Sequence, residues 1–270
     1  MQSIQIEGIE LLQFDSFPQE ALNHFSTTIH GGISQDAYSS FNLSFYSGDK
    51  IGNILTNRMR LSNALNVSIE KLFIPYQTHE DKILVIDKDF LSLPNEEQVT
   101  ELNGIDALIT NEKNVCIGIT TADCVPLLIF DPHKKVLAAI HAGWKGTALK
   151  IGAKTAKQMI EQFGCNPKDL LVGIAPSISP QIFEVGDEVG EAFEKAGFDL
   201  SAISFRNPQT GKLHIDLWQA NKLPLLDVGI LSGNIEIASI CTFSNPDRFF
   251  SARRQTIHSG RMVTGGIIVN

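Results

Sequence analysis

The stretch TTADCVPLLIFDPHKKVLAAIHAGW, residues 120–144, decides the fold. It contains two apolar runs, 125–131 and 135–143, and the sequence DPHKK between them predicts a turn. Two such runs with a short connection predict an antiparallel β-hairpin. Residues equally distant from the turn lie together at the open end of a hairpin. Cys124 and His141 are such a pair, so we expect the thiol and the imidazole to be neighbours.

Strands and helices alternate irregularly along the rest of the chain. We expect a helix over 51–66, another over 147–164 beginning at Thr147 as N-cap, a third over 184–197, and a strand that turns into a helix over 212–229. We expect a strand pair or an extended segment over 4–14 and a loop over 93–104. We expect strands over 71–79, 82–87, 106–110, 115–121, 169–179, 235–243, 248–255 and 261–269. Because many strands are arranged as hairpins, the pattern favours an α+β or mixed-sheet fold over a doubly wound parallel one.

Composition narrows the classes of protein to which the chain can belong. A formal net charge of -8 argues against binding to the phosphate backbone of nucleic acids. The four cysteines form no C-x-x-C pair, which indicates reduced thiols in a cytoplasmic protein. The sequence shows no signal peptide, no apolar run of about 18 residues, no repeat and no linker. We therefore expect a single domain over residues 1–270 with neither nucleic acid nor membrane as partner.

A thiol beside an imidazole has two chemical uses. It is a nucleophile activated by a base, or it is part of a metal site, since zinc accepts both sulfur and nitrogen ligands. His79, at the end of the predicted strand 71–79, is the candidate for a third ligand. Taken singly, Cys124 also fits a core position, His141 a turn and His79 the surface. Spacing alone leaves these alternatives open.

Four short motifs, QTH (77–79), DALIT (106–110), TADCVPLLIFDP (121–132) and HAGWKGT (141–147), resemble those of the YfiH-like family. This family was first labelled a multicopper polyphenol oxidase or laccase domain, and its members were later described as purine nucleoside phosphorylases. The resemblance continues through 173–189, 216–230 and 241–261, and covers nearly the whole chain.

The resemblance implies a catalytic zinc ion bound by His79, Cys124 and His141. It implies phosphorolysis of adenosine, inosine, guanosine and methylthioadenosine to free base and ribose 1-phosphate, with possible deamination of adenosine. The fold it implies has mixed β-sheets packed between helices in αββα-like layers, similar to toxin-type cysteine hydrolases. Ile29 stands where the family usually has arginine, which places the source of phosphate binding in question.

Three protein ligands would leave one tetrahedral zinc position open, which is typical of catalytic sites. Such a zinc ion lowers the pKa of bound water, as deamination requires. For substrate and phosphate we consider contacts from Asn42, Asp123 and the cations Arg58, Lys145, Arg253, Arg254 and Arg261. Asp123 would orient a ligand, and Asn42 would contact ribose or base. Each of these side chains also fits a purely structural role.

Three other functions compete with the phosphorylase hypothesis. A metal-independent hydrolase or amidase would need only Cys124 and His141. A copper-dependent polyphenol oxidase is disfavoured because the seven histidines include no H-x-H pair. A purine-sensing or partner-binding module would bind nucleosides without turnover and use the acidic stretch 93–101 as its contact surface.

Overall fold

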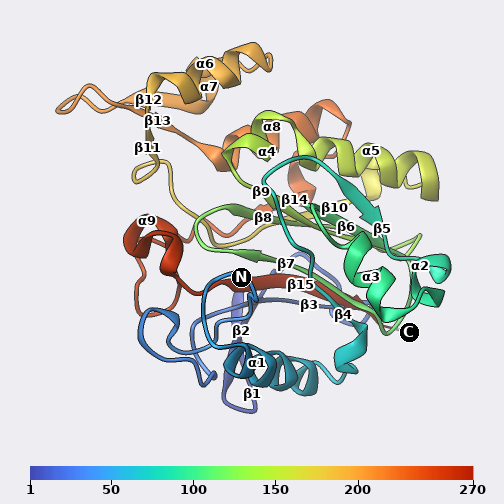
Figure 1. Ribbon diagram of the computed structural model, residues 1–270. Helices are drawn as coiled ribbons and strands as arrows, with labels where there is room; N and C mark the ends of the chain where they lie inside the picture. Colours follow the sequence, from blue (N-terminus) through green and yellow to red (C-terminus); the bar gives the residue numbers. More distant parts are fainter. Residues whose placement is uncertain (270) are drawn as a thin grey trace.

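The computed structural model describes residues 1–269, and two six-stranded sheets lie face to face at its centre (Figure 1). The strand order is β1-β2-β3-β15-β7-β4 in the first sheet and β14-β10-β8-β9-β6-β5 in the second. Both sheets are mixed, because β4 runs parallel to β7 in the first, and β14 and β5 run parallel to β10 and β6 in the second. The strands of the two sheets are β1 Gln2–Ile6, β2 Ile9–Gln13, β3 Leu22–Thr27, β4 Leu72–Phe73, β5 Ile83–Val85, β6 Ala107–Thr110, β7 Cys116–Thr121, β8 Val125–Asp131, β9 Val136–Ala142, β10 Leu171–Ile174, β14 Ile235–Ile237 and β15 Met262–Ile268.

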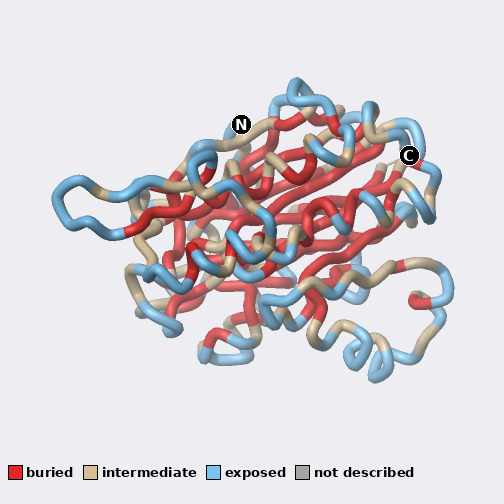
Figure 2. The backbone as a smooth tube through the Cα atoms, turned by 90° about the horizontal axis from the view of Figure 1, so that it is seen from above, coloured by how far each residue is buried: buried red, intermediate tan, exposed pale blue. Residues whose placement is uncertain are grey.

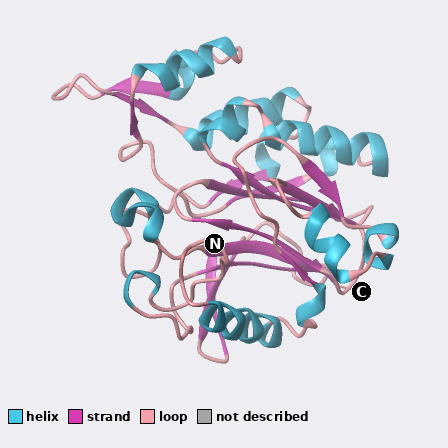
Figure 3. Cartoon of the chain, viewed as in Figure 1, coloured by secondary structure: helices cyan, strands magenta, loops and turns pink. Residues whose placement is uncertain are grey.

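Helices cover the outer faces of both sheets (Figure 3). Helix α1, Ile51–Ala64, packs on the first sheet, while α5, Ile151–Phe163, and α8, Leu217–Asp227, pack on the second. This arrangement confirms the predicted α+β architecture with mixed sheets between helices. The remaining α-helices are α2 Lys88–Ser92, α3 Asn95–Glu101, α4 Trp144–Ala148, α6 Asp187–Lys195, α7 Leu200–Ile203 and α9 Ala252–Gln255. In residues 1–269, no helix combines the length and the apolar character needed to cross a bilayer.

A small third sheet projects from one side of these layers, at the upper left of Figure 1. Its order is β11-β13-β12, with antiparallel pairing throughout. The strands are β11 Glu184–Val185, β12 Ser204–Arg206 and β13 Leu213–Ile215, and helices α6 and α7 pack beside them. The predicted strand-to-helix transition within 212–229 is confirmed, since Asp216 caps α8 by accepting a hydrogen bond from the backbone N–H of Gln219.

The hairpin predicted over 125–143 forms the centre of the second sheet. Strand β8 pairs antiparallel with β9 in a register that aligns Val125 with Ala142 and Asp131 with Val136. Successive side chains of a strand point to opposite faces, so Leu127 packs toward α5 and α8, whereas Leu128 packs between the two sheets. Both strands are buried throughout, because both faces of the sheet are covered. Figure 2 shows the buried backbone in red, gathered in the interior of the molecule.

Two predicted elements are wrong in type. The predicted loop 93–104 contains helix α3, whose first turn carries Glu96 and Glu97, where acidic side chains complement the helix dipole. The predicted strand 248–255 contains helix α9 instead, because the Ser251 hydroxyl accepts a hydrogen bond from the backbone N–H of Arg254 and so caps a short helix.

Several other predicted elements have the right type but wrong boundaries, among them the strands 169–179 and 235–243, which shorten to β10 and β14. The strand 71–79 shortens to β4, and the chain leaves the strand well before His79, whose φ of 64° lies in the left-handed region. The helix 147–164 divides into α4 and α5 at Lys150, which has a φ of 58°. Thr147 is therefore inside α4 rather than at its N-cap, and Gly143 occupies the N-cap position.

Candidate metal centre and active site

Two connections between the sheets bring candidate ligands to the same edge of the molecule. His79 lies between β4 of the first sheet and β5 of the second, and Cys124 lies between β7 of the first and β8 of the second. His141 is on β9, where strand alternation places its side chain on the inter-sheet face with those of Leu137 and Ala139. One potential ligand atom from each of the three residues lies within 4.8 Å of the other two.

Asp106, at the head of β6, holds two of these residues in place. Its Oδ1 lies 2.7 Å from Nδ1 of His141 and accepts a hydrogen bond of 3.0 Å from the backbone N–H of His79. Its Oδ2 accepts hydrogen bonds from the backbone N–H groups of Thr78 and Glu80. Because Nδ1 is engaged by Asp106, Nε2 is the ring nitrogen of His141 left for a metal ion, which displaces any proton that Nε2 carries when it binds. Asp106 thus fixes the His141 ring and the left-handed turn at His79 together.

The charges at the site reinforce one another. Burial alone would raise the pKa of the Cys124 thiol, but the charges of His141 and His79 and their hydrogen bonds to the sulfur lower this pKa to about 6. Burial opposes protonation of His141, but Cys124 and Asp106 raise the pKa of its imidazole to about 9. Burial raises the pKa of Asp106, and the hydrogen bonds from His141 and from backbone N–H groups outweigh that effect and lower it. The site therefore holds Cys124 as a thiolate, the form that binds metals and attacks electrophiles.

Gly143 leaves the space between the ligands free of any side chain. A Cβ atom at this position would lie 3.0 Å from Cδ2 of His79, 3.2 Å from Sγ of Cys124 and 3.7 Å from Cε1 of His141. One thiolate and two imidazoles, converging on a point without a side chain, form a donor set suited to zinc. The rings of His79 and His141 are nearly perpendicular, at 85°, so they approach this point from different directions.

A cavity of about 320 Å³ opens onto this site, large enough for a small organic ligand. Arg261 is the only arginine or lysine in its wall, and its guanidinium donates hydrogen bonds to the carbonyl oxygens of Ser259 and Gly260. Burial lowers the pKa of Arg261, and the charges of Cys124 and Asp123 offset this only in part. No carboxylate in residues 1–269 forms an ion pair with Arg261. The complete wall consists of Ser44, Tyr46, Tyr76, Gln77, His79, Thr120, Thr121, Ala122, Cys124, His141, Ala252, Ile257 and Arg261.

Asp123 positions the Cys124 loop but hydrogen-bonds to neither histidine. Its buried carboxylate accepts hydrogen bonds from the hydroxyls of Thr242 and Ser251 and from the backbone N–H of Arg253. Its φ of 83° is rare for a residue with a side chain. These three contacts hold a strained turn in place, and the turn directs the next residue, Cys124, toward the histidines.

The other predicted substrate contacts lie outside the cavity wall. Asn42 is fully buried, and its amide hydrogen-bonds to Ser47, Asp49 and the backbone of Arg261. It therefore shapes the backbone that carries Arg261. Arg58 lines a neighbouring cavity, and Lys145 is an exposed residue on α4.

The remaining cations and Ile29 also have local partners. The guanidinium of Arg254 donates to the carbonyl oxygens of Thr242, Phe243 and Phe249 and so braces the loop before α9. The guanidinium of Arg253 donates to the carbonyl oxygen of Glu184. Ile29 packs in an apolar cluster that includes Ala122 and Met262, so no cation enters from that position.

Sequence reasoning missed Asp106 as a functional residue. The signal was present, because an aspartate heads the apolar strand sequence DALIT. Its carboxylate is fully buried, which a carboxylate tolerates only when it is hydrogen-bonded or paired. Gly143 carried no signal, because its role depends on a close approach of three chain segments.

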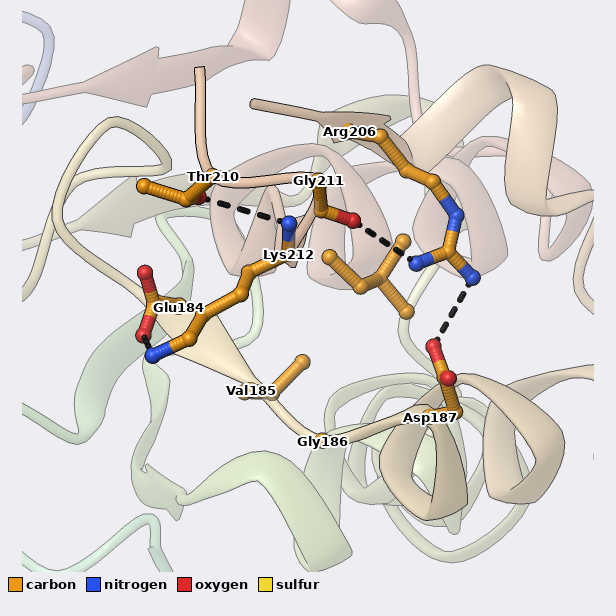
Figure 4. A pocket seen from close by; sticks show the side chains of 9 residues that line it. Glu184, Val185, Gly186, Asp187, Arg206, Thr210, Gly211 and Lys212 are labelled. Atoms are coloured by element: carbon orange, nitrogen blue, oxygen red, sulfur yellow. Dashed lines mark hydrogen bonds and ion pairs between the residues drawn. The ribbon is translucent and has the colours of Figure 1, made fainter. Parts of the chain in front are cut away.

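A second cavity, on the third sheet, offers no comparable chemistry (Figure 4). Its charged groups pair with each other: Lys212 with Glu184 at 2.7 Å, and Arg206 with Asp187 at 2.8 Å. Both pairs are largely exposed and therefore contribute little to stability or binding. In residues 1–269, the cluster of thiol, imidazole and carboxylate groups lies at the inter-sheet edge and not in this cavity.

The layered fold and this site define a mixed-sheet αββα protein with a candidate His-Cys-His metal centre. Residues 23–269 match the family described as multi-copper polyphenol oxidoreductase laccase, and the chain belongs to that family. It is 47% identical, over 92% of both chains, to a purine nucleoside phosphorylase of Bacteroides thetaiotaomicron. It is 42% identical to an adenosine deaminase of an unknown prokaryotic organism, over 91% of this chain and 94% of that one. The crystal structure of YlmD from Geobacillus stearothermophilus superimposes with a TM-score of 0.90 at 28% identity, over 99% of this chain and 98% of that chain.

Proposed function

We propose that the chain is a zinc-dependent purine nucleoside phosphorylase. It would cleave adenosine, inosine and guanosine with phosphate to the free base and ribose 1-phosphate, and methylthioadenosine to adenine and methylthioribose 1-phosphate. The observation that carries the proposal is the convergence of His79, Cys124 and His141 on the unfilled space at Gly143, in the wall of a cavity suited to a small ligand. The relatives named purine nucleoside phosphorylase support this choice of reaction.

The residues of the chain would divide the work as follows. Zinc, when bound, supplies a Lewis acid that stabilises negative charge developing on the substrate. Cys124 and the two histidines hold the ion, and Asp106 keeps His141 in the tautomer that binds it. Arg261 holds the phosphate, because it is the one arginine or lysine of the cavity wall and no carboxylate in residues 1–269 forms an ion pair with it.

One experiment tests the reaction directly. Purified protein is incubated with adenosine or inosine, with and without phosphate, and the products are separated by chromatography. We expect adenine or hypoxanthine and ribose 1-phosphate to form only with phosphate. If adenosine is converted to inosine regardless of phosphate, the main activity is deamination, as the name of the second relative suggests for that protein.

A second candidate is a metal-independent thiol hydrolase or amidase. The hydrogen bond between His141 and Asp106, with Cys124 on the other side of the imidazole, is the arrangement of a nucleophile, a base and an orienting carboxylate. Chelation separates the two functions. A phosphorylase that depends on zinc loses turnover after removal of the metal and regains it on addition of zinc, whereas a thiol hydrolase keeps its activity throughout.

Elemental analysis of the purified protein identifies the metal. We expect one zinc ion per chain. Stoichiometric copper, together with oxidation of a phenolic substrate, would instead support the oxidase function that the family description names.

A further inference from the structure

A cavity of about 390 Å³ adjoins the metal cavity, and Tyr46 and Tyr76 line both. Their ring centroids are 4.2 Å apart, and the ring planes are inclined at 48°. Both residues are substantially exposed, by 60% for Tyr46 and 39% for Tyr76. The tyrosine pair therefore forms a shared wall with aromatic surface available to a planar ligand.

Arg58 gives the cavity that adjoins the metal cavity a buried positive charge. The residue is 9% exposed, its Nε donates a hydrogen bond of 2.8 Å to the carbonyl oxygen of Leu43, and its guanidinium carbon lies 4.2 Å from the ring centre of Phe45. In residues 1–269 no carboxylate forms an ion pair with it, although Glu70 shares the cavity wall. Burial lowers the pKa of Arg58 to about 10, so the guanidinium stays protonated at neutral pH.

The two terminal nitrogens of Arg58 have no hydrogen-bond partner in the described chain, and neither is sealed off in the interior. Because Arg58 is one of the residues that line this cavity, these nitrogens are the part of its guanidinium left to bind a ligand there. A buried cation without a counter-ion is costly, and an anionic ligand that forms a forked pair of hydrogen bonds to a guanidinium offsets that cost. Phosphate has the geometry for such a pair.

The rest of the wall suits a nucleobase. Phe45 and the two tyrosines offer aromatic surface, and Val99 and Leu102 add apolar contacts. The side-chain nitrogen of Gln98 donates to the carbonyl oxygens of Leu91 and Leu93, which leaves its oxygen to accept a hydrogen bond from a base amino group.

We propose that this cavity, referred to below as the Arg58 cavity, is a second ligand site that binds a nucleoside monophosphate, with the phosphate on Arg58 and the base against Tyr46 and Tyr76. The site is separate from the metal centre and does not depend on the reaction proposed above. Because the tyrosine pair is common to both cavities, a ligand here contacts part of the wall that a nucleoside at the metal centre would contact.

Calorimetric titration of the zinc-loaded protein with adenosine 5′-monophosphate tests the site. Adenosine alone and inorganic phosphate alone serve as comparison ligands, and we expect both to bind more weakly at this site than the monophosphate. Arg58→Gln removes the charge, and we expect it to abolish the binding. Val99 is 67% exposed and lines only the Arg58 cavity, so Val99→Glu adds a negative charge there with little risk to the fold.

We expect Val99→Glu to weaken monophosphate binding about tenfold through like-charge repulsion, and the uncharged, equally large Val99→Gln to leave it unchanged. Cys124→Ala, which disrupts the metal centre, should also leave it unchanged. If Arg58→Gln does not fold, the comparison of Val99→Glu with Val99→Gln tests the site on its own. The proposal is overturned if the wild type binds no monophosphate, if Val99→Glu binds it as tightly as Val99→Gln, if a folded Arg58→Gln retains the binding, or if Cys124→Ala removes it.

Discussion

Asp106 Oδ1 lies 2.7 Å from Nδ1 of His141, and the same carboxylate accepts hydrogen bonds from the backbone N–H groups of residues 78–80. One buried group thus sets both the imidazole from β9 and the turn that carries His79. The geometry of the candidate metal centre depends on this carboxylate as much as on the ligands themselves.

Asp106→Asn should lower zinc affinity by roughly 10- to 100-fold while the protein stays folded, because an amide is a weaker acceptor for His141 and cannot replace every backbone hydrogen bond. Competition with a chelator of known affinity measures the change. Asp131→Asn is the matched control, since Asp131 is also buried and accepts backbone hydrogen bonds, but at the turn end of the hairpin. Equal zinc affinities in the two variants would contradict the role of Asp106.

Gly143→Ala should reduce zinc affinity and turnover without a large loss of stability. The backbone at Gly143 has φ −62° and ψ 171°, which alanine adopts readily, but the new Cβ would lie close to His79 and Cys124. Zinc content and melting temperature together check this expectation. Gly52→Ala, on α1 where a Cβ meets no atom within 4 Å, is the control and should leave zinc binding unchanged.

Arg261→Gln should raise the KM for phosphate at least about tenfold and change the KM for the nucleoside much less, because a charge-assisted hydrogen bond to phosphate is lost. Steady-state kinetics with each substrate varied in turn measures both constants. Lys145→Gln removes a cation that is not part of the cavity wall and should leave both unchanged. A phosphate KM that is equal in the two variants would assign phosphate binding to another residue.

Glu10 should make the free energy of unfolding depend on pH in the acid range. Burial raises the pKa of Glu10, but hydrogen bonds from Arg248 and Ser3 outweigh burial and lower it below its usual value of 4.5. The folded state therefore gains stability above the unfolded pKa and loses it as the pH falls through the lower folded pKa. Denaturant melts of Glu10→Gln should show a loss of about 1 kcal/mol at neutral pH and a smaller loss near pH 3. A loss that is the same at both pH values would contradict this assignment.

The central hairpin and the helices on the outer faces could be predicted from the sequence because their signals are local. The apolar runs on both sides of DPHKK specify β8 and β9, and an apolar repeat with helical spacing specifies α1. The predicted proximity of Cys124 and His141 follows from the register of that hairpin. The residues that shape the space around them are different, because Asp106 and Gly143 reach the site only through the packing of separate segments.

The predicted type or boundary of an element was wrong where side chains outside the apolar pattern decide the structure. The polar sequence of α3 lacks an apolar face and suggested a loop, yet its acidic first turn stabilises a helix. The end of α4 depends on the left-handed conformation of Lys150, which no residue type in that stretch indicates. That residues 1–270 form a single domain and that the protein is cytoplasmic stay predictions.

The paths of the ligands through the fold have a consequence for how the protein holds together. His79 and Cys124 each lie where the chain passes from the first sheet to the second, and His141 belongs to the second sheet. An ion bound by all three would cross-link the two connecting segments to β9 at the edge where the two sheets face each other. The stabilisation by the ion would increase with the concentration of free zinc. Above the dissociation constant, each tenfold rise in free zinc would add about 1.4 kcal/mol to the free energy of unfolding. A shortage of zinc would then weaken the attachment of the two sheets to each other and also abolish the proposed activity.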